Sequence, residues 1–323
     1  MKHKLNMHSV SSFITGKYFI FVLFILVFAL FAILAPALCT SDSIRNILVN
    51  ASLTAISGCG MTFAITLGGF DLSVGSIMAL STCVIAKLVP VIGIPAAILL
   101  AFAVSAVVGL LNGLIITKLK IQTFVATLAT QVIIKGLALI YTGGLSVSIF
   151  SYTQLKLFSS ARFLGIPLPV LITVVVYLVC QFLYNRCKFG VYLRAAGSNE
   201  KAARLSAVPV ERITICAFII TALTSCLSGV ITVSQVLTAN ASTGGSFALN
   251  AITVVVLGGT SLSGGSGFLG GSVVAAILII IENGLTLLGY SDDIQRLVIG
   301  CILIASLTLK TFMSPLSRKE EVA

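Results

Sequence analysis

Residues 95–117 read PAAILLAFAVSAVVGLLNGLIIT, an uncharged apolar stretch that is long enough to cross a lipid bilayer as a helix. Similar stretches alternate with short polar turns from residue 18 to residue 312. Hydrophobic residues make up 58% of the 323 residues and charged residues 9%, and the mean hydropathy is +1.15. Such a chain cannot cover a water-soluble domain with charge, so the sequence predicts an all-α polytopic protein embedded in the lipid bilayer.

Ten segments are apolar enough to be membrane spans. They are roughly residues 18–38, 49–67, 72–89, 95–117, 122–141, 167–185, 212–235, 247–258, 267–288 and 294–312. The first segment is too long for the core of a signal peptide, so we expect an uncleaved span. The eighth is too short for a complete span, which predicts a half-helix or a re-entrant segment. We expect broken or re-entrant segments near 68–76 and 247–267, within a single transmembrane domain over residues 1–323.

The distribution of lysine and arginine predicts the orientation of the chain. With the N-terminus inside, fourteen of the twenty basic residues fall in cytoplasmic segments. These are Lys2, Lys4, Lys17, Lys118, Lys120, Arg186, Lys188, Arg194, Lys201, Arg204, Arg212, Lys310, Arg318 and Lys319. Because basic residues concentrate on the cytoplasmic side, we expect both termini to be cytoplasmic. The longest inside segment is then the loop 186–211, and the longest outside loop is 142–166.

The composition also argues against several other functions. The net charge of +11 is accounted for by cytoplasmic loops, so we expect no nucleic-acid partner. Most of the eight cysteines lie in apolar segments and no CxxC pair occurs, so we expect free thiols and no metal site. Both histidines, His3 and His8, lie in the N-terminal tail, which leaves no catalytic constellation. The sequence therefore predicts no enzyme activity, no catalytic residues and no cofactor.

The first motif is GGFDLSVGS at residues 68–76, between two apolar runs. Paired glycines turn the chain, and Asp71 and Ser73 fall where an N-cap would accept hydrogen bonds from the next helix. Two interpretations remain open: a capped hairpin turn, or a broken-helix element that lines a polar cavity.

A second glycine-rich turn, GGTSLSGGSG at residues 258–267, echoes the first and hints at an internal duplication. Residues 265–272 also resemble a phosphate loop. Gly271 stands where that loop needs a lysine, so we expect no nucleotide site.

The third motif, at residues 195–209, predicts a short cytoplasmic helix. Ser198 or Asn199 can cap it, Glu200 and Arg204 form a pair four residues apart, and Pro209 ends it. Two interpretations are open for this helix, which is rich in small residues. It is either a surface helix within a loop or a docking helix for a soluble partner.

Two charged residues fall inside predicted spans. Lys135 and Glu282 both lie about 20 Å from the inner end of their helices at a rise of about 1.5 Å per residue. Exposure of either charge to lipid is costly, so we expect both to face the protein interior. They either pair with each other or reach separately towards the outer interface.

Together the motifs resemble the permease subunits of bacterial ATP-binding-cassette importers for monosaccharides, of the ribose type. The resemblance covers nearly the whole chain. It rests on the stretches GGFDLSVGS at 68–76, FVATL at 124–128, KGLALIYTGG at 135–144, GSNEKAARLSAVPVERI at 197–213, VLGGTSLSGGSGFLGG at 256–271 and ENGLTLLG at 282–289. The family commonly has Gly at the position of Ala207, Arg at that of Lys135 and Ile at that of Phe70.

The resemblance implies a permease in the bacterial inner membrane that translocates a ribose-like monosaccharide. The implied partners are a second permease copy, a cytoplasmic ATPase and a periplasmic sugar-binding protein. The expected coupling residues to the ATPase are Gly197, Asn199, Glu200, Ala203 and Arg204. The expected substrate pathway contains Asp71, Ser73, Lys135, Glu282 and Asn283.

Other classes of function compete with this interpretation. An ion-driven secondary transporter, or a channel for a small polar solute, would also be apolar throughout. Carriers of that kind more often place several carboxylates inside their spans, and here only Asp71 and Glu282 qualify. The sequence does not identify the sugar.

Overall fold

The computed structural model describes residues 19–318 of the chain. Side chains are described from residue 24 onward, except at 272, 273, 275, 276, 303, 306, 307 and 309–318. The chain divides into two compact units: residues 1–47 with 276–323, and residues 48–275. The first is called the terminal unit and the second the central unit, and each is described by itself. That the whole chain acts as one transmembrane domain stays a prediction.

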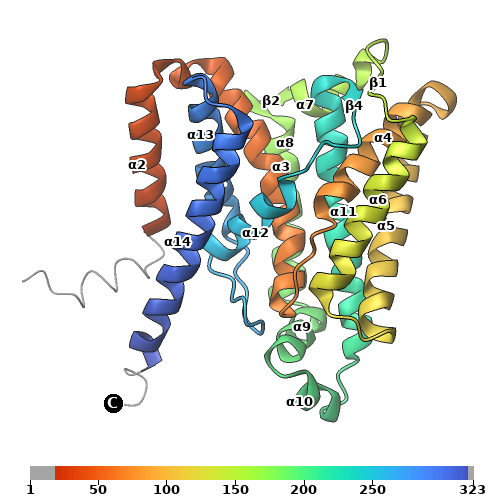
Figure 1. The fold of residues 1–323 in the computed structure, drawn as a ribbon, viewed down its shortest axis with the longest axis vertical. Coiled ribbons are helices and arrows are strands. Elements are labelled where there is room, and N and C mark those ends of the chain that lie inside the picture. The colour runs from red at the N-terminus through yellow and green to blue at the C-terminus, as the bar shows by residue number, and fades with distance from the viewer. Residues whose placement is uncertain (1–18, 319–323) are drawn as a thin grey trace, which may run out of the picture. The chain divides into compact units, whose positions relative to one another are not determined.

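Each of the ten predicted apolar segments contains one helix in the described part of the chain (Figure 1). The helices are α2 (Phe19–Leu34), α3 (Ser41–Thr66), α4 (Val74–Ile92), α5 (Ile94–Lys118), α6 (Thr123–Thr142), α8 (Leu168–Asn185), α11 (Val210–Val236), α12 (Phe247–Leu257), α13 (Gly271–Leu287) and α14 (Asp292–Arg318). Among the described residues, six are long and apolar enough to cross a membrane, namely α3, α4, α5, α6, α8 and α11. Shorter apolar stretches lie in α2, α12 and α13. The prediction of an all-α polytopic membrane protein is confirmed.

The remaining elements are short and lie in the connections. They are the 3-10 turns η1 (Pro36–Cys39) and η2 (Thr153–Lys156), the helices α7 (Leu157–Ser160), α9 (Lys188–Ser198) and α10 (Glu200–Leu205), and the two-residue strands β1 (Val147–Ser148), β2 (Arg162–Phe163), β3 (Ile166–Pro167) and β4 (Thr238–Ala239). β1 pairs antiparallel with β4, and β2 pairs antiparallel with β3.

Helix α3 begins at Ser41, well before the start predicted at residue 49. The extra turns are polar, so an apolar pattern does not find them. Two capping features explain them. The hydroxyl of Thr40 accepts a hydrogen bond from the backbone N–H of Ser43 at 3.4 Å. Asp42 lies in the first turn, where a negative charge favours the helix dipole.

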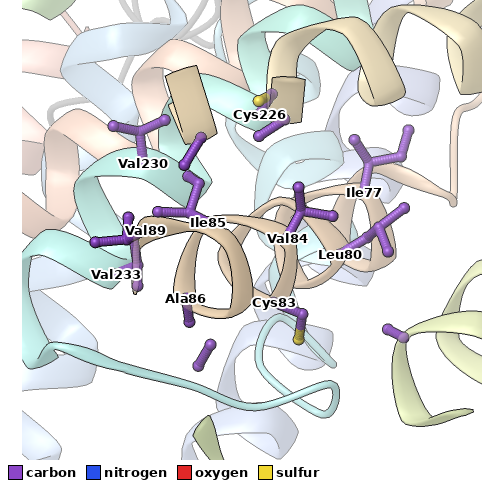
Figure 2. Close-up of a cluster of buried hydrophobic side chains, with 14 of the residues drawn as sticks. Ile77, Leu80, Cys83, Val84, Ile85, Ala86, Val89, Cys226, Val230 and Val233 are labelled. Atoms are coloured by element: carbon purple, nitrogen blue, oxygen red, sulfur yellow. The ribbon is translucent and has the colours of Figure 1, made fainter. Parts of the chain in front are cut away.

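The core of the central unit lies where α11 packs against α5 and α4. Figure 2 shows part of it, with Ile85 and Val89 of α4 close to Val230 and Val233 of α11. All of these side chains are buried. Loop residues from the predicted outer side, such as Ile149 and Leu155, belong to the same cluster.

Glycines let the backbone of α11 approach two neighbouring helices, α3 and α5. A Cβ at Gly109 or Gly113 of α5 would lie 2.8 Å from the Cα of Ile219 or 2.6 Å from that of Ile215. A Cβ at Gly60 of α3 would lie 2.9 Å from the Cα of Thr221. Small residues at such contacts are the usual means of packing helices in membranes, where lipid is as apolar as leucine.

Helix α12 confirms the short eighth segment, because its 11 residues extend only about 16 Å at 1.5 Å per residue. The connection 240–246 leads into it from β4 and has no helix or strand (Figure 1). Within this connection, a Cβ at Gly244 would lie 2.6 Å from the carbonyl oxygen of Gly75, in the first turn of α4. The connection therefore passes beside a membrane-spanning helix, as expected for a re-entrant segment.

The connections of the central unit sort into two groups, as alternating spans require. Loop 142–166 meets the end of α11: the N–H of Ile149 donates to the carbonyl of Leu237 at 2.8 Å, and β1 pairs with β4. At the other group, Lys118 at the end of α5 pairs with Glu211 at the start of α11. Loops predicted on one side of the membrane thus contact each other.

The terminal unit contains α2, η1, the start of α3, most of α13 and all of α14. Gly284 of α13 lies against the ring of Phe31 of α2, where a Cβ would overlap the ring atoms. This contact explains why glycine is required in the second half of α13.

Candidate functional site

The two glycine-rich turns meet in the central unit. The backbone N–H of Gly265, in the connection between α12 and α13, donates to the carbonyl oxygen of Thr66 at the end of α3 at 2.8 Å. A Cβ at Gly264 would lie 3.0 Å from the backbone nitrogen of Gly68. The sequence showed that the two turns echo each other, but it did not predict that they touch.

The third motif reaches the same point. A Cβ at Gly197 in α9 would overlap the carbonyl oxygen of Thr66 and lie 2.7 Å from the nitrogen of Gly265. A Cβ at Gly264 would lie 2.6 Å from the carbonyl oxygen of Gly197. We call the meeting point of Thr66, Gly68, Gly197, Gly264 and Gly265 the glycine junction. At this junction the predicted cytoplasmic segment, residues 186–211, contacts both glycine-rich turns directly.

Asp71 and Ser73 form a buried polar cluster beside this junction. One carboxylate oxygen of Asp71 accepts hydrogen bonds from the backbone N–H of Ser73 at 2.9 Å and from its hydroxyl at 2.5 Å. The Ser73 hydroxyl accepts from the side-chain amide of Asn112 in α5 at 2.9 Å. All three side chains are fully buried. The cluster ties the α3–α4 turn to the middle of α5.

The predicted N-cap is wrong in detail. Helix α4 begins at Val74, and the side chain of its cap residue, Ser73, makes no capping hydrogen bond. Asp71 instead accepts both of its bonds from Ser73, which closes a local turn before the helix starts. Burial raises the pKa of Asp71 to about 6, and the hydrogen bonds from Ser73 oppose that rise.

Two acceptor atoms in this cluster remain without a hydrogen-bond partner among the described residues. They are the second carboxylate oxygen of Asp71 and the side-chain oxygen of Asn112. Buried polar atoms are usually paired, so the cluster holds capacity for a further donor. This agrees better with a polar cavity element than with a simple capped turn.

Of the other predicted pathway residues, Lys135 lies in the central unit, and Glu282 and Asn283 lie in the terminal unit. Lys135 lies on the exposed side of α6, so the prediction that it faces the interior is wrong for the central unit. The buried side of α6 instead presents small or apolar residues such as Ile134 and Ala138. Glu282 and Asn283 are half-buried in the terminal unit, where the Asn283 amide donates to the carbonyl of Ile279 at 2.9 Å. Pairing of Lys135 with Glu282 stays a prediction.

The predicted cytoplasmic segment folds as two helices, α9 and α10, of which the sequence predicted only the second. Asn199 caps α10, since its side-chain oxygen accepts from the N–H of Ala202 at 3.0 Å. The helix ends at Leu205 rather than near Pro209. Ala207 follows with a φ of 59°, a conformation that glycine adopts more easily.

Ala203 does not present itself to a partner as predicted. Its exposure is only 4%, and it packs against Ala196 of α9 and Val210 of α11. Among the residues of α10, only Ala203 is buried against the protein. The exposed residues of α10 are Glu200, Lys201, Ala202, Arg204 and Leu205.

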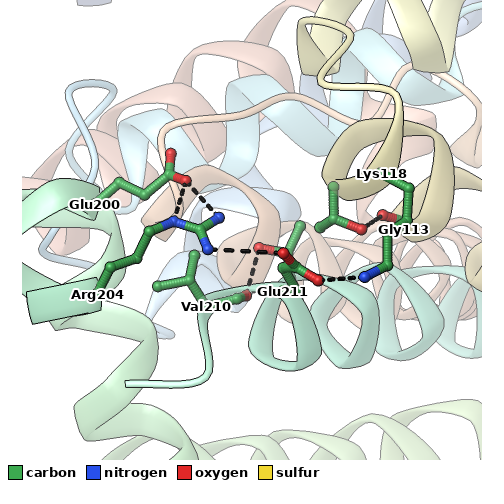
Figure 3. Close-up of polar contacts among 8 residues, drawn as sticks. Gly113, Lys118, Glu200, Arg204, Val210 and Glu211 are labelled. Atoms are coloured by element: carbon green, nitrogen blue, oxygen red, sulfur yellow. Dashed lines mark hydrogen bonds and ion pairs between the residues drawn. The ribbon is translucent and has the colours of Figure 1, made fainter. Parts of the chain in front are cut away.

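A chain of ion pairs links α10 to two membrane helices (Figure 3). Arg204 contacts Glu200 at 2.9 Å and Glu211 of α11 at 3.7 Å. Glu211 also accepts a hydrogen bond from Lys118 of α5 at 2.6 Å. The sequence predicted the pair of Glu200 and Arg204 within α10. It gave no sign that Glu211 contacts both Arg204 of α10 and Lys118 of α5.

The sequence analysis did not identify two features of the candidate site. Asn112 lies in an apolar span, and an isolated polar residue there was the available signal. The connection 240–246, ASTGGS preceded by Asn240, is a polar stretch beside α4, where non-helical backbone is tolerated only if protein or water covers it.

Replacing Asp71 with alanine should destabilise the protein by about 1–3 kcal/mol, because the buried N–H and hydroxyl of Ser73 lose their acceptor. Asp71→Asn keeps an acceptor oxygen and should cost less. Thermal unfolding in detergent measures both changes. Equal unfolding temperatures for Asp71→Ala and the wild type would contradict this view of the cluster. Solute uptake per folded Asp71→Ala subunit then distinguishes a capped turn from an element that lines a polar cavity. Unchanged uptake would mean that the turn is purely structural.

Gly197→Ala should destabilise the protein by about 1–3 kcal/mol, because the added methyl group overpacks the glycine junction. Gly245→Ala is the matched control, since its Cβ would meet only the carbonyl oxygen of Ser242 at 3.9 Å. Thermal unfolding of the two purified variants measures the difference. If both variants unfold at the same temperature, the backbones at the junction are not in tight contact.

Comparison with known proteins identifies relatives over most of the chain. The chain is 39% identical over 294 residues to the ribose import permease protein RbsC of Bacillus subtilis (strain 168), covering 89% of this chain and 90% of the relative. It is 36% identical over 319 residues to the L-arabinose transport system permease protein AraH of Escherichia coli (strain K12), covering 95% of each. It is 33% identical over 303 residues to the D-allose transport system permease protein AlsC of the same strain, covering 92% of each. No solved structure matches.

A family model described as branched-chain amino acid transport system / permease component matches residues 43–307. The match includes both glycine-rich turns, the Asp71 cluster and the whole cytoplasmic segment. The chain therefore belongs to this family of transport permease components.

Proposed function

We propose that the protein is the permease subunit of an ATP-binding-cassette importer that carries a ribose-like monosaccharide across the bacterial inner membrane. The observation that carries the proposal is the similarity, over 89–95% of the chain, to permeases named for ribose, L-arabinose and D-allose transport. All three are named for monosaccharides, which supports that substrate class. The family is one of transport components, which supports a subunit without enzyme activity.

A separate ATPase drives transport by docking on α10, and a periplasmic sugar-binding protein delivers the sugar. The exposed face of α10 with its cap at Asn199, and the glycine junction behind it, support this role. A push on α10 reaches both glycine-rich turns through Gly197, since the three backbones are in contact. Gly197 and Asn199 thus hold the docking helix in place, and Glu200 and Arg204 present its charged side.

The solute passes along Asp71, Ser73 and the connection 240–246. The unpaired acceptors of Asp71 and Asn112 support a polar environment there. Hydroxyl and amide groups in 240–246 suit a neutral polyol. Lys135, Glu282 and Asn283 lie further along the pathway of the assembled transporter. A second copy of the chain completes the pore, and Lys135 lies on a face of α6 that one copy leaves exposed.

Both chain termini lie in the cytoplasm, with loop 142–166 outside and α10 inside. In a variant without native cysteines, Ser151→Cys should react with a membrane-impermeant maleimide in cells whose outer surface of the inner membrane is accessible. Lys201→Cys should react only after the membrane is opened. Both positions are exposed in the folded chain, so access depends on sidedness. The reverse labelling pattern would overturn the orientation.

Ala202→Arg should abolish association with the cognate ATPase while leaving the permease folded, because Ala202 is exposed and outside the membrane helices. Co-purification of the ATPase, together with ATP-dependent D-ribose uptake in liposomes, measures the effect. Ser151→Arg adds the same charge on the opposite side and should retain both. Uptake that persists without the ATPase and stops with an ionophore would instead establish an ion-driven transporter.

A further inference from the structure

A cavity of about 620 Å³ opens beside α10. Its walls come from the end of α5 and the α5–α6 turn, from α10 and from the start of α11. The lining residues are Ile116, Thr117, Lys120, Ile121, Gln122, Thr123, Glu200, Arg204, Val210, Glu211 and Thr214. All of these belong to the central unit. The cavity thus lies on the face that carries the proposed docking helix, and a second membrane connection forms half of it.

The charged side chains that line the cavity are Lys120, Arg204, Glu200 and Glu211. Glu200 and Glu211 are already engaged by Arg204 and Lys118. Lys120 also lines the cavity, and it has no ion-pair partner among the described residues. An exposed lysine is ordinarily satisfied by water, but here it stands at a cavity whose carboxylates are occupied. The cavity therefore has one cation available for an acidic group.

The backbone fixes the position of Lys120. Its φ is 55°, in the left-handed region that side chains other than glycine rarely adopt. Such a conformation costs about 1–3 kcal/mol and persists only where the surrounding structure imposes it. The turn between α5 and α6 therefore presents this lysine from a defined backbone conformation.

Large apolar side chains flank the cavity in a part of the chain that lies outside the membrane helices. Leu205, the last residue of α10, is 91% exposed, and Leu119 beside Lys120 is 66% exposed. Apolar anchors around a charged group are typical of a protein interface, in which the anchors exclude water from the polar contact.

We propose that the α5–α6 turn is a second docking element for the ATPase, with Lys120 receiving a carboxylate of that subunit while Leu119 and Leu205 pack against its apolar surface. This inference rests on the proposed function, because it extends the interface from α10 across the cavity. Continuity with α10, the proposed docking helix, identifies the occupant as the ATPase.

Lys120→Glu should weaken binding of the cognate ATPase to the purified permease in neutral-lipid nanodiscs about tenfold or more, because it places a carboxylate opposite the partner's carboxylate. Lys188→Glu, an exposed residue of α9 that does not line the cavity, makes the same change in net charge and should bind as the wild type does. Wild-type affinity for Lys120→Glu would overturn the inference.

A zero-length carbodiimide cross-linker tests the contact directly. In the assembled complex it should join the amine of Lys120 to an ATPase carboxylate, and mass spectrometry of the cross-linked peptides identifies the pair. Lys120→Arg keeps the charge and the assembly but has no reactive amine, so this cross-link should disappear. A complex that assembles with no cross-link at Lys120 would overturn the inference.

Two further arms distinguish the alternatives. If Ala202→Arg also binds the ATPase normally, docking through α10 fails and the proposed function fails with it. If Ala202→Arg loses the ATPase but Lys120→Glu keeps it, only the second docking element is wrong. If Lys120→Glu weakens binding only when the nanodiscs contain anionic lipid, a lipid headgroup occupies the cavity and the inference is overturned.

Discussion

The end of the central unit that carries α9 and α10 depends on backbones that approach too closely for any side chain. At the glycine junction, a Cβ on Gly197 would overlap the carbonyl oxygen of Thr66, and one on Gly264 would press against Gly197. The single hydrogen bond from Gly265 to Thr66 closes the contact at 2.8 Å. Three segments that are far apart in sequence can come into backbone contact here because the glycines have no side chains. The position of α9, and of α10 after it, follows from this packing.

The ion pairs around α10 have a different role from the junction. Arg204, Glu211 and Lys118 are all more than a third exposed, and exposed ion pairs contribute about 0–1 kcal/mol each. These ion pairs therefore contribute little to the stability of α10 and mainly set its orientation. Packing of Ala203 against Ala196 and Val210 fixes the buried side of the helix. The exposed side of the helix carries charged residues, which would contact a partner.

Long apolar stretches were enough to predict the ten helices of the predicted spans, since each of these helices overlaps one stretch. The short α12 followed from the length of its apolar segment, and residue type narrowed the cap of α10 to Ser198 or Asn199, of which the structure uses Asn199. Local patterns did not predict the contacts between distant segments. Asn112 meets Ser73 only because α5 lies beside the α3–α4 turn, and Ala203 is buried only because α9 and α11 cover it.

Helix α11 indicates which parts of the central unit move together. Gly60, Gly109 and Gly113 hold its backbone against α3 and α5, so these helices form one tightly packed body. Helix α12 differs, because its 11 residues are reached through the non-helical connection 240–246. Conformational change concentrates where few backbone hydrogen bonds must break. In the proposed transporter, a push delivered at Gly197 would meet a tightly packed body on the α3 side, and on the α12 side it would meet a short helix between two glycine-rich connections. The proposed function therefore places the movement that opens a path for the solute on the α12 side.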